Sequence, residues 1–188
     1  MSKAVLISIR PKWVEKIANG EKTIEARKTR PKPETPFKCY IYCTLPKYPH
    51  EDFIATDYPR PQFYGGGKVV GEFTCDRIYK IDKDSTDFLF KAGGLSVYKQ
   101  AAEEKCGLCV AMTDDELHGY LGHCQGYGWH ISDLRIYDAP KELSEFKTLC
   151  RVDADCCACP YYNYTKMNCD GRVIGRPPQS WCYVETLF

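Results

Sequence analysis

The chain lacks an apolar run near the roughly 20 residues of a membrane-spanning helix, and it has almost no excess charge of either sign. Its 26 Lys and Arg residues nearly balance 25 Asp and Glu residues, which leaves a net charge of +1. A nucleic-acid partner would therefore be held by a local patch and not by the field of the whole molecule. The segment 1–10 does not combine a basic region with a long apolar stretch, as a signal peptide does. We therefore expect a cytoplasmic protein without a membrane partner.

Several catalytic motifs are missing as well. The sequence contains no Walker loop, no GxGxxG after a strand, no HExxH and no GxSxG. The glycine-rich segment 65–68 is not followed by Ser or Thr and does not precede a predicted helix, so we do not expect it to cradle a phosphate. Internal repeats and low-complexity tracts are also missing.

The length of 188 residues and the hydrophobic fraction of 44% indicate one domain with a sizeable core. Several strands and a few short helices are predicted without regular βαβ alternation, which favours an α+β fold built on a compact β-barrel. We expect a single domain over 1–188, with 150–175 as a Cys-rich insertion before the last strand. Strands are predicted at 4–9, 21–28, 37–44, 68–81, 127–138 and 180–185, helices at 11–19 and 113–120, a partly helical segment at 84–112 and a long loop at 45–67.

The chain contains 12 Cys, several of them close together near the end. In a reducing compartment thiols stay free or bind a metal. Four thiolates separated by short turns can form a closed tetrahedral zinc site, and a metal clip would order a tail with few aliphatic residues. We therefore expect a structural zinc ion held by Cys150, Cys156, Cys159 and Cys169. Cys157 is an alternative ligand, and unligated thiols or disulfides are the alternatives to metal.

A cluster of charged residues follows the first predicted helix. Glu25 and Arg27 share one face of a strand, whereas Lys22 reaches that face only if it belongs to the turn after Gly20. Together the three can recognise a nucleobase, because the carboxylate accepts from N–H groups and the cations bind carbonyl or phosphate oxygens. The same residues can also catalyse, with Glu25 as a general base for water and Lys22 stabilising an oxyanion. A surface salt bridge of little energetic weight is the simplest alternative.

Three aromatic residues are candidates for stacking on a base, since every base has a π-face. They are Tyr127, Trp129 and Trp181. Packing in the core is the alternative for each of them.

The stretch around this charged cluster resembles a known family. Residues 8–11 (SIRP), a short helix, and then residues 20–27 (GEKTIEAR) resemble the signature of the ASCH domain, a G-x-K-x-x-E-x-R pattern after a helix. Residues 70–73 are similar to a later family strand. Residues 126–131 and 176–181 are similar to segments of phage-type and bacterial ASCH proteins. The resemblance covers about residues 4–146 and the final strand.

This resemblance implies a PUA-like β-barrel with a cleft beside the first helix. Family members are linked to RNA, coactivator complexes or modified nucleosides, and one bacterial branch resembles an amidohydrolase of acetylated cytidine. Lys22 matches the motif lysine, but Glu25 stands where that branch has its Thr nucleophile, and Glu116 is a candidate for its catalytic Glu. The residues expected to bind the ligand are Arg10, Arg27, Glu72, Tyr127, Trp129, Gln179 and Trp181.

The sequence thus favours an ASCH-type domain whose partner is RNA or a nucleoside or nucleotide bound in the cleft. The first alternative is an amidohydrolase of acylated nucleosides such as N4-acetylcytidine, with Lys22, Glu25 and Glu116 as catalytic residues. A non-catalytic protein-interaction module is the second.

Overall fold

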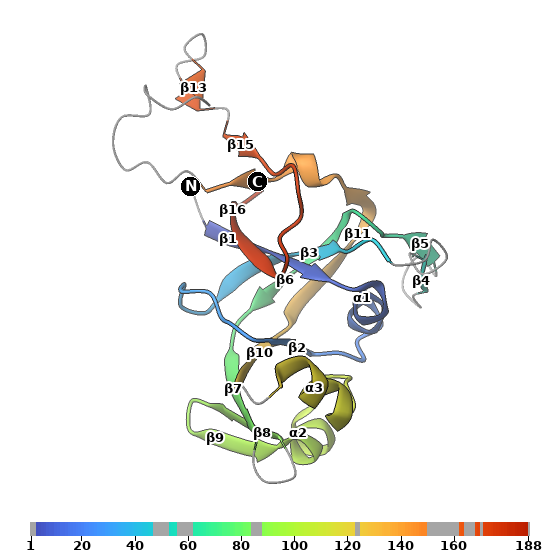
Figure 1. Cartoon of the computed structure of the whole chain (residues 1–188), viewed down its shortest axis with the longest axis vertical. Coiled ribbons are helices and arrows are strands. Elements are labelled where there is room, and N and C mark those ends of the chain that lie inside the picture. The colour runs from blue at the N-terminus through green and yellow to red at the C-terminus, as the bar shows by residue number, and fades with distance from the viewer. Residues whose placement is uncertain are drawn as a thin grey trace.

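The computed structural model describes residues 3–46, 53–55, 62–83, 88–122, 125–149, 162–163, 168–169 and 171–187. These form an α+β fold in which most strands belong to two sheets (Figure 1). The helices are α1 (Pro11–Ala18), α2 (Lys99–Cys106), α3 (Asp114–Leu121) and a short 3-10 helix at Leu143–Glu145. Two short ribbons are formed by β4 (Phe53–Ala55) with β5 (Gln62–Tyr64), and by β13 (Tyr162–Asn163) with β14 (Asn168–Cys169).

The larger sheet has seven strands in the order β11-β6-β3-β1-β16-β12-β15. Its central strand pair, β1 and β3, is parallel, and β16 returns antiparallel beside β1. Both faces of the sheet are covered. The alternating residues of β3 supply Cys39 and Ile41 to the core cluster that includes α1, and Tyr40 and Tyr42 to a second cluster around Phe146. The strands are β1 (Lys3–Ile9), β3 (Phe37–Cys43), β6 (Val69–Cys75), β11 (Ser132–Lys141), β12 (Lys147–Thr148), β15 (Arg172–Val173) and β16 (Trp181–Glu185).

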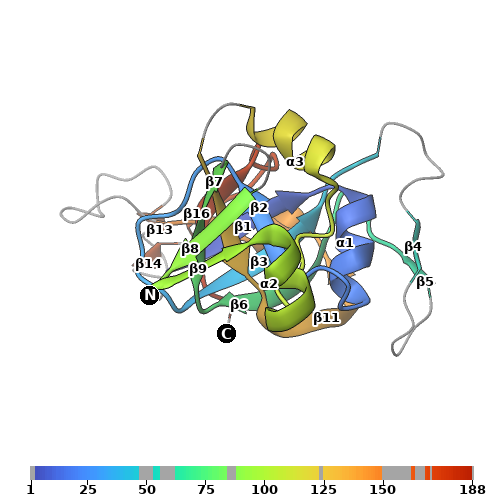
Figure 2. The same cartoon turned by 90° about the horizontal axis from the view of Figure 1, so that it is seen from below.

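The smaller sheet has five strands in the order β2-β10-β7-β8-β9. Helices α2 and α3 pack on it and close a separate core cluster (Figures 1 and 2). Helix α3 begins with a capping box. The Thr113 hydroxyl accepts a hydrogen bond from the Glu116 N–H, and the Glu116 carboxylate accepts one from the Thr113 N–H. The strands are β2 (Ile24–Arg27), β7 (Ile78–Lys83), β8 (Phe88–Ala92), β9 (Leu95–Tyr98) and β10 (Gly126–His130).

Two long strands expected from the sequence are each divided between the two sheets. The segment expected at 68–81 becomes β6 and β7, and the segment expected at 127–138 becomes β10 and β11. β6 pairs with β11 in the larger sheet, and β7 pairs with β10 in the smaller sheet. The two chain segments therefore stay paired with each other as they pass from one sheet to the other. Among the described residues, these sheets do not close into one barrel, so the expected compact barrel is an open two-sheet arrangement.

Local deviations in these strands have simple causes. The register shifts between Ile41 and Tyr42 opposite Gly71, and a Cβ atom on Gly71 would lie 2.6 Å from the Arg135 carbonyl oxygen. Only glycine allows this close approach. The strand expected to end at residue 138 continues through Pro140 to Lys141, because β11 is an edge strand and needs no N–H at residue 140. In the described part of the chain, no helix is long and apolar enough to cross a membrane.

Candidate functional site

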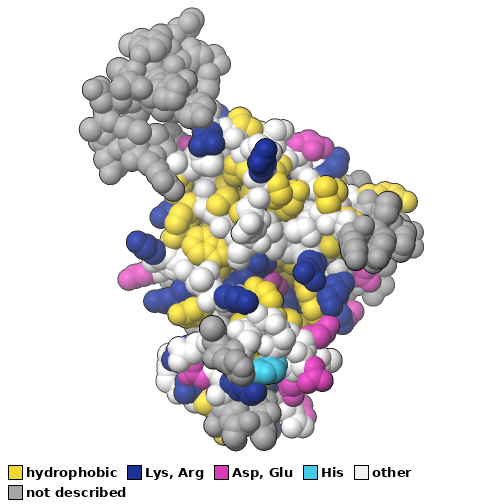
Figure 3. All heavy atoms as spheres, in the orientation of Figure 1, with side chains coloured by type: hydrophobic (Ala, Val, Ile, Leu, Met, Phe, Trp, Pro, Cys, Tyr) yellow, Lys and Arg dark blue, Asp and Glu magenta, His cyan; other side chains and the backbone are white. Residues whose placement is uncertain are grey.

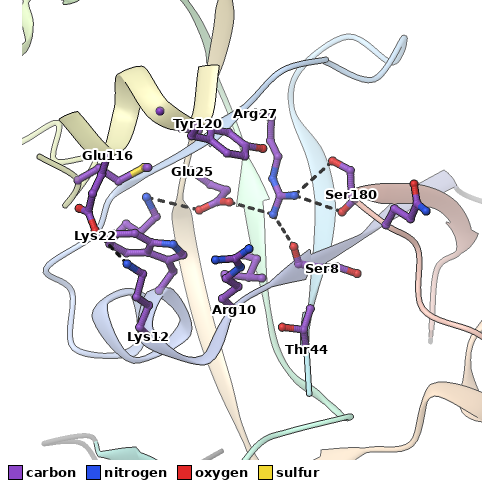
Figure 4. Close-up of a pocket in the computed structure, with 16 residues that line it drawn as sticks. Ser8, Arg10, Lys12, Lys22, Glu25, Arg27, Thr44, Glu116, Tyr120 and Ser180 are labelled. Atoms are coloured by element: carbon purple, nitrogen blue, oxygen red, sulfur yellow. Dashed lines mark hydrogen bonds and ion pairs between the residues drawn. The ribbon is translucent and has the colours of Figure 1, made fainter. Parts of the chain in front are cut away.

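A cavity of about 530 Å³ opens between α1, the edge strand β2, α3 and the segment before β16 (Figure 4). Figure 3 shows Lys and Arg side chains gathered across the middle of this face, over β2 and α1. The described part of the chain has four buried polar or charged residues, and all four line this cavity. The lining residues are Ser8, Ile9, Arg10, Lys12, Trp13, Lys22, Glu25, Ala26, Arg27, Thr44, Met112, Glu116, Gly119, Tyr120, Gln179 and Ser180.

Three charged side chains form the floor of the cavity. One carboxylate oxygen of Glu25 lies 2.9 Å from Arg27 Nη2, and the other lies 3.5 Å from Lys22 Nζ. The exposed fractions are 2% for Lys22, 6% for Glu25 and 5% for Arg27. This buried triad, Lys22–Glu25–Arg27, carries a net charge of +1.

The local backbone explains how three residues at this spacing meet. Glu25 and Arg27 are two residues apart on β2, so their side chains lie on one face. Lys22 precedes the strand, in the turn that follows Gly20, whose φ of 74° is in the left-handed region. The Lys22 N–H donates to the Lys16 carbonyl and its Nζ donates to the Val110 carbonyl at 2.5 Å. The condition set by the sequence, that Lys22 lie in this turn, is therefore met.

Arg27 is fixed by the larger sheet. Its Nη2 donates to the Ser8 carbonyl at 2.6 Å, and its Nη1 contacts the carbonyl and the hydroxyl of Ser180 at 3.4 and 3.3 Å. Ser8 in turn donates its hydroxyl to the Pro178 carbonyl at 2.6 Å. A strand of the small sheet is thus tied to β1 and to the residues before β16. The guanidinium orientation is set by the packing of the two sheets.

Burial lowers the pKa of Lys22 below its ordinary value, and the Glu25 carboxylate opposes this effect. The pKa of Tyr120, on the opposite wall, is raised mainly by burial, while the nearby Arg27 cation acts in the other direction. The cavity therefore contains an amine that loses its proton more easily than a solvent-exposed lysine. It also contains a phenol that remains neutral.

The rim carries a second ion pair and the aromatic walls. Lys12 of α1 lies 2.9 Å from the Glu116 carboxylate of α3, and both side chains are exposed. This contact and the capping bond lower the pKa of Glu116. Trp13 from α1 and Tyr120 from α3 line the cavity, and the Lys12 and Lys22 ammonium groups lie 4.2 and 5.3 Å from the Trp13 ring centre.

Of the charged and polar residues predicted from the sequence, six are brought together in this cavity. They are Arg10, Lys22, Glu25, Arg27, Glu116 and Gln179. Glu72 lies elsewhere, on β6, where it binds Lys38 at 2.9 Å and accepts from the Tyr137 hydroxyl at 2.7 Å. Glu72 therefore does not line this cavity, and its expected contact with a ligand stays a prediction.

The three aromatic residues expected to stack on a base do not line this cavity either. Trp129 is directly opposite Glu25 in the β2–β10 pairing, yet its exposed fraction is 0%, and its ring packs edge-on against Phe37 of β3. Trp181 contacts Trp129 and donates to Thr29, and Tyr127 packs against the same core cluster. Neither Trp181 nor Tyr127 lines the cavity. Core packing, the alternative for these aromatics, is what the structure shows for Trp129.

The sequence reasoning missed Trp13 and Tyr120 as cavity walls. Trp13 shares a helix face with the buried Val14 and Ile17, and that spacing is typical of core packing. Tyr120 lies four residues after Glu116 and therefore on the same face of α3. Had Glu116 been used to orient the helix toward the cleft, that spacing would have indicated Tyr120.

No group of three or more metal-binding side chains is found in the described residues. Cys150, Cys156 and Cys159 lie outside the described residues, as does the side chain of Cys169. The expected zinc site therefore remains a prediction.

Comparison with solved structures identifies the fold. The ASCH protein of Zymomonas mobilis matches 97% of this chain over 87% of its own, with a TM-score of 0.54 and 17% identity. Two single-residue variants of that protein match at 16% identity, with TM-scores of 0.54 and 0.53. They cover 98% and 97% of this chain and 91% and 88% of their own. No family model and no curated protein matches the sequence. The chain thus has the fold of these ASCH structures, as the sequence motif indicated.

Proposed function

We propose that this chain, whose fold is that of ASCH structures, binds RNA or a nucleobase or nucleoside in the cavity between α1, β2 and α3. The observation that carries this proposal is the buried triad Lys22–Glu25–Arg27 on the floor of an open cavity. Burying three charges costs more free energy than packing apolar groups of the same size. Such a cluster in a cleft is typical of a functional site.

The donors and acceptors of the triad suit the edge of a base. Lys22 and Arg27 offer N–H donors for ring carbonyl or ring nitrogen acceptors, and Glu25 offers acceptors for exocyclic amines. The volume of about 530 Å³ lies within the range of small-molecule sites. Trp13 and Tyr120, on opposite helices, supply the aromatic walls against which a base can stack.

Retention of ligands from a panel tests this proposal. The protein is incubated with common and modified nucleosides, nucleotides and short RNA oligomers, and bound species are identified by native mass spectrometry. Wild type should retain at least one class of ligand, and Glu25→Gln should lose it. Asp76→Asn is the matched control, because Asp76 is a carboxylate outside the cavity that pairs with His130 at 2.6 Å. Retention of no member of the panel would contradict the proposal.

Hydrolysis of an acylated nucleoside is a second candidate function. The observation that favours it is the lowered pKa of Lys22 beside the Glu25 carboxylate, since an amine that releases its proton readily can take part in acid–base steps. Glu116 is less suited to act as an acid, because its pKa is lowered and Lys12 already pairs with it. Release of acetate from N4-acetylcytidine by wild type, lost in Lys22→Met, would support hydrolysis. If micromolar enzyme releases no acetate from N4-acetylcytidine, hydrolysis of this substrate class is contradicted.

A further inference from the structure

The loop that joins β2 to β3, residues 28–36, carries an excess of positive charge on the surface. Lys28, Arg30 and Lys32 are exposed, and none of them forms an ion pair with any described residue. With Glu34 as its acidic residue, the loop has three cations against one carboxylate, a net charge of +2 in a chain of net charge +1. Figure 3 shows dark blue side chains at the left margin, where Figure 1 draws this loop. A polyanion is attracted to such a local excess in a nearly neutral protein.

The loop is held along β16 and starts at the cavity. It begins directly after Arg27, which lines the cavity. The Trp181 Nε1–H donates to the Thr29 hydroxyl at 3.1 Å, and the Lys32 N–H donates to the Tyr183 hydroxyl at 2.8 Å. These bonds pair successive positions of the loop with successive positions of β16. The exposed cations of the loop therefore follow a fixed path that leads away from the cavity.

Aromatic rings accompany the cations on this path. Lys28 Nζ lies 5.6 Å from the ring centre of Tyr120, which lines the cavity. Farther along, Lys3 Nζ lies 3.8 Å from the ring centre of Tyr183. Tyr183 and Trp181, both on β16, are partly exposed. Cations that bind phosphates, beside rings on which bases stack, are the elements of sites for single-stranded nucleic acid.

We infer that these residues form a strip that binds a single RNA strand continuing from the base in the cavity. This inference rests on the proposed function, because the cavity holds one base of the same strand. Unpaired RNA suits both parts, since its bases can be turned out one by one and stacked on protein side chains. Five extended residues span at most about 17 Å, so the strip accompanies only a few nucleotides. The strip consists of Lys28, Arg30, Lys32, Trp181 and Tyr183.

Calorimetric titration with ligands of two lengths tests the strip. For uracil, cytosine and adenine, the nucleoside 5′-monophosphate is compared with a single-stranded RNA hexamer of the same base. Wild type should bind the hexamer about tenfold or more tightly at low salt. The triple variant Lys28→Gln/Arg30→Gln/Lys32→Gln should lose this gain and keep its affinity for the monophosphate, because none of the three residues lines the cavity.

The salt dependence of hexamer binding gives a second readout. Each phosphate neutralised on a single strand adds about 0.7 to the slope of log affinity against log salt, so removal of three contacts should reduce that slope by about 2. A matched control removes two lysines and one arginine elsewhere on the surface, in the triple variant Arg77→Gln/Lys83→Gln/Lys105→Gln. These three residues are exposed and lie outside the strip. The control should keep both the hexamer gain and the salt slope of wild type.

The outcomes separate the strip from the cavity. Equal affinity for hexamer and monophosphate, or equal losses in the two triple variants, overturns the strip and leaves the proposed function standing. Binding of neither ligand overturns both. Hexamer binding that is lost in the strip variant but unchanged in Glu25→Gln overturns the continuation of the strand into the cavity. An oligoglutamate of the same charge that binds as tightly as the hexamer would assign the strip to an acidic protein and overturn the inference.

Discussion

Glu25 Oε1 lies 2.9 Å from Arg27 Nη2, and the two side chains share the face of β2 that forms the cavity floor. The same carboxylate also faces Lys22 Nζ at 3.5 Å. One acidic group is therefore the shared counter-charge of two buried cations. This arrangement makes Glu25 important for stability as well as for binding.

Replacing Glu25 with Gln should destabilise the fold by about 3–5 kcal/mol, because it leaves two buried cations without a counter-charge. Denaturant unfolding of the variant and wild type measures this difference. Glu72→Gln is the control, because the Glu72 carboxylate binds the more exposed Lys38, and we expect a loss of about 1 kcal/mol or less. If both variants lost a similar amount of unfolding free energy, Glu25 would not be the counter-charge on which the two buried cations depend.

The lowered pKa of Lys22 predicts a pH dependence of stability. The unfolded chain holds the Lys22 proton up to its ordinary pKa of about 10.4, whereas the folded chain releases it at lower pH because of burial. Between these two values the unfolded state binds more protons, so the free energy of unfolding gains a contribution that rises with pH. Below the folded-state pKa this contribution is constant.

The test is the difference between wild type and Lys22→Met in denaturant unfolding across the alkaline range. Wild type should gain stability relative to the variant as pH rises toward about 10.4. Lys105→Met, which removes an exposed lysine of α2, should show no such relative change. A difference that is flat with pH, or that falls, would show that Lys22 keeps an ordinary or raised pKa.

Trp129 and Tyr120 should behave in opposite ways. Trp129 is fully buried against Phe37, so Trp129→Ala should cost about 3–5 kcal/mol of stability by leaving a cavity in the core. The milder Trp129→Phe should fold and keep ligand affinity. Tyr120→Ala should cost less stability but weaken binding, since loss of a stacked ring is worth about 1–3 kcal/mol. Unchanged affinity in Tyr120→Ala together with weakened affinity in Trp129→Phe would reverse this assignment.

We also propose that the Cys-rich segment binds one zinc ion through Cys150, Cys156, Cys159 and Cys169. Elemental analysis of metal-replete protein should find about one zinc per chain, and Cys156→Ser/Cys159→Ser should lose it. Cys106→Ser is the control, because Cys106 is exposed at the end of α2 and is not one of the four proposed ligands. Zinc-free wild type, or zinc retained in the double variant, would contradict this proposal.

Short-range patterns in the sequence predicted much of the fold and the charged part of the site. Pro11 and Gly20 bracket α1, and the Thr113–Glu116 pair begins α3, because helix ends depend on neighbouring residues. Likewise the spacing from Lys22 to Arg27 was enough to expect convergence once Gly20 was assigned to a turn. These interactions are local, and the signal for them lies within a few residues.

Features that depend on distant segments could not be predicted in the same way. The division of the strand expected at 68–81 between two sheets depends on pairing with β10 and β11, whose partner residues lie 45 or more positions later. The burial of Trp129 depends on Phe37, from a different sheet. Tyr120 lines the cavity only because α3 lies near α1, and the Lys12–Glu116 ion pair joins these two helices. Hydrophobic periodicity within one segment carries no information on these contacts.

Photo-crosslinking of a bound nucleotide is the measurement that tests the central claim most directly, because it identifies the residues beside the base. Protein loaded with a 4-thiouridine nucleotide or oligomer is irradiated, digested and analysed by mass spectrometry. If the base occupies this cavity, the adducts should lie on peptides that contain Trp13 or Tyr120, and they should disappear in Glu25→Gln. Adducts confined to other surfaces, such as β8 and β9, and unchanged in Glu25→Gln, would show that the ligand binds elsewhere.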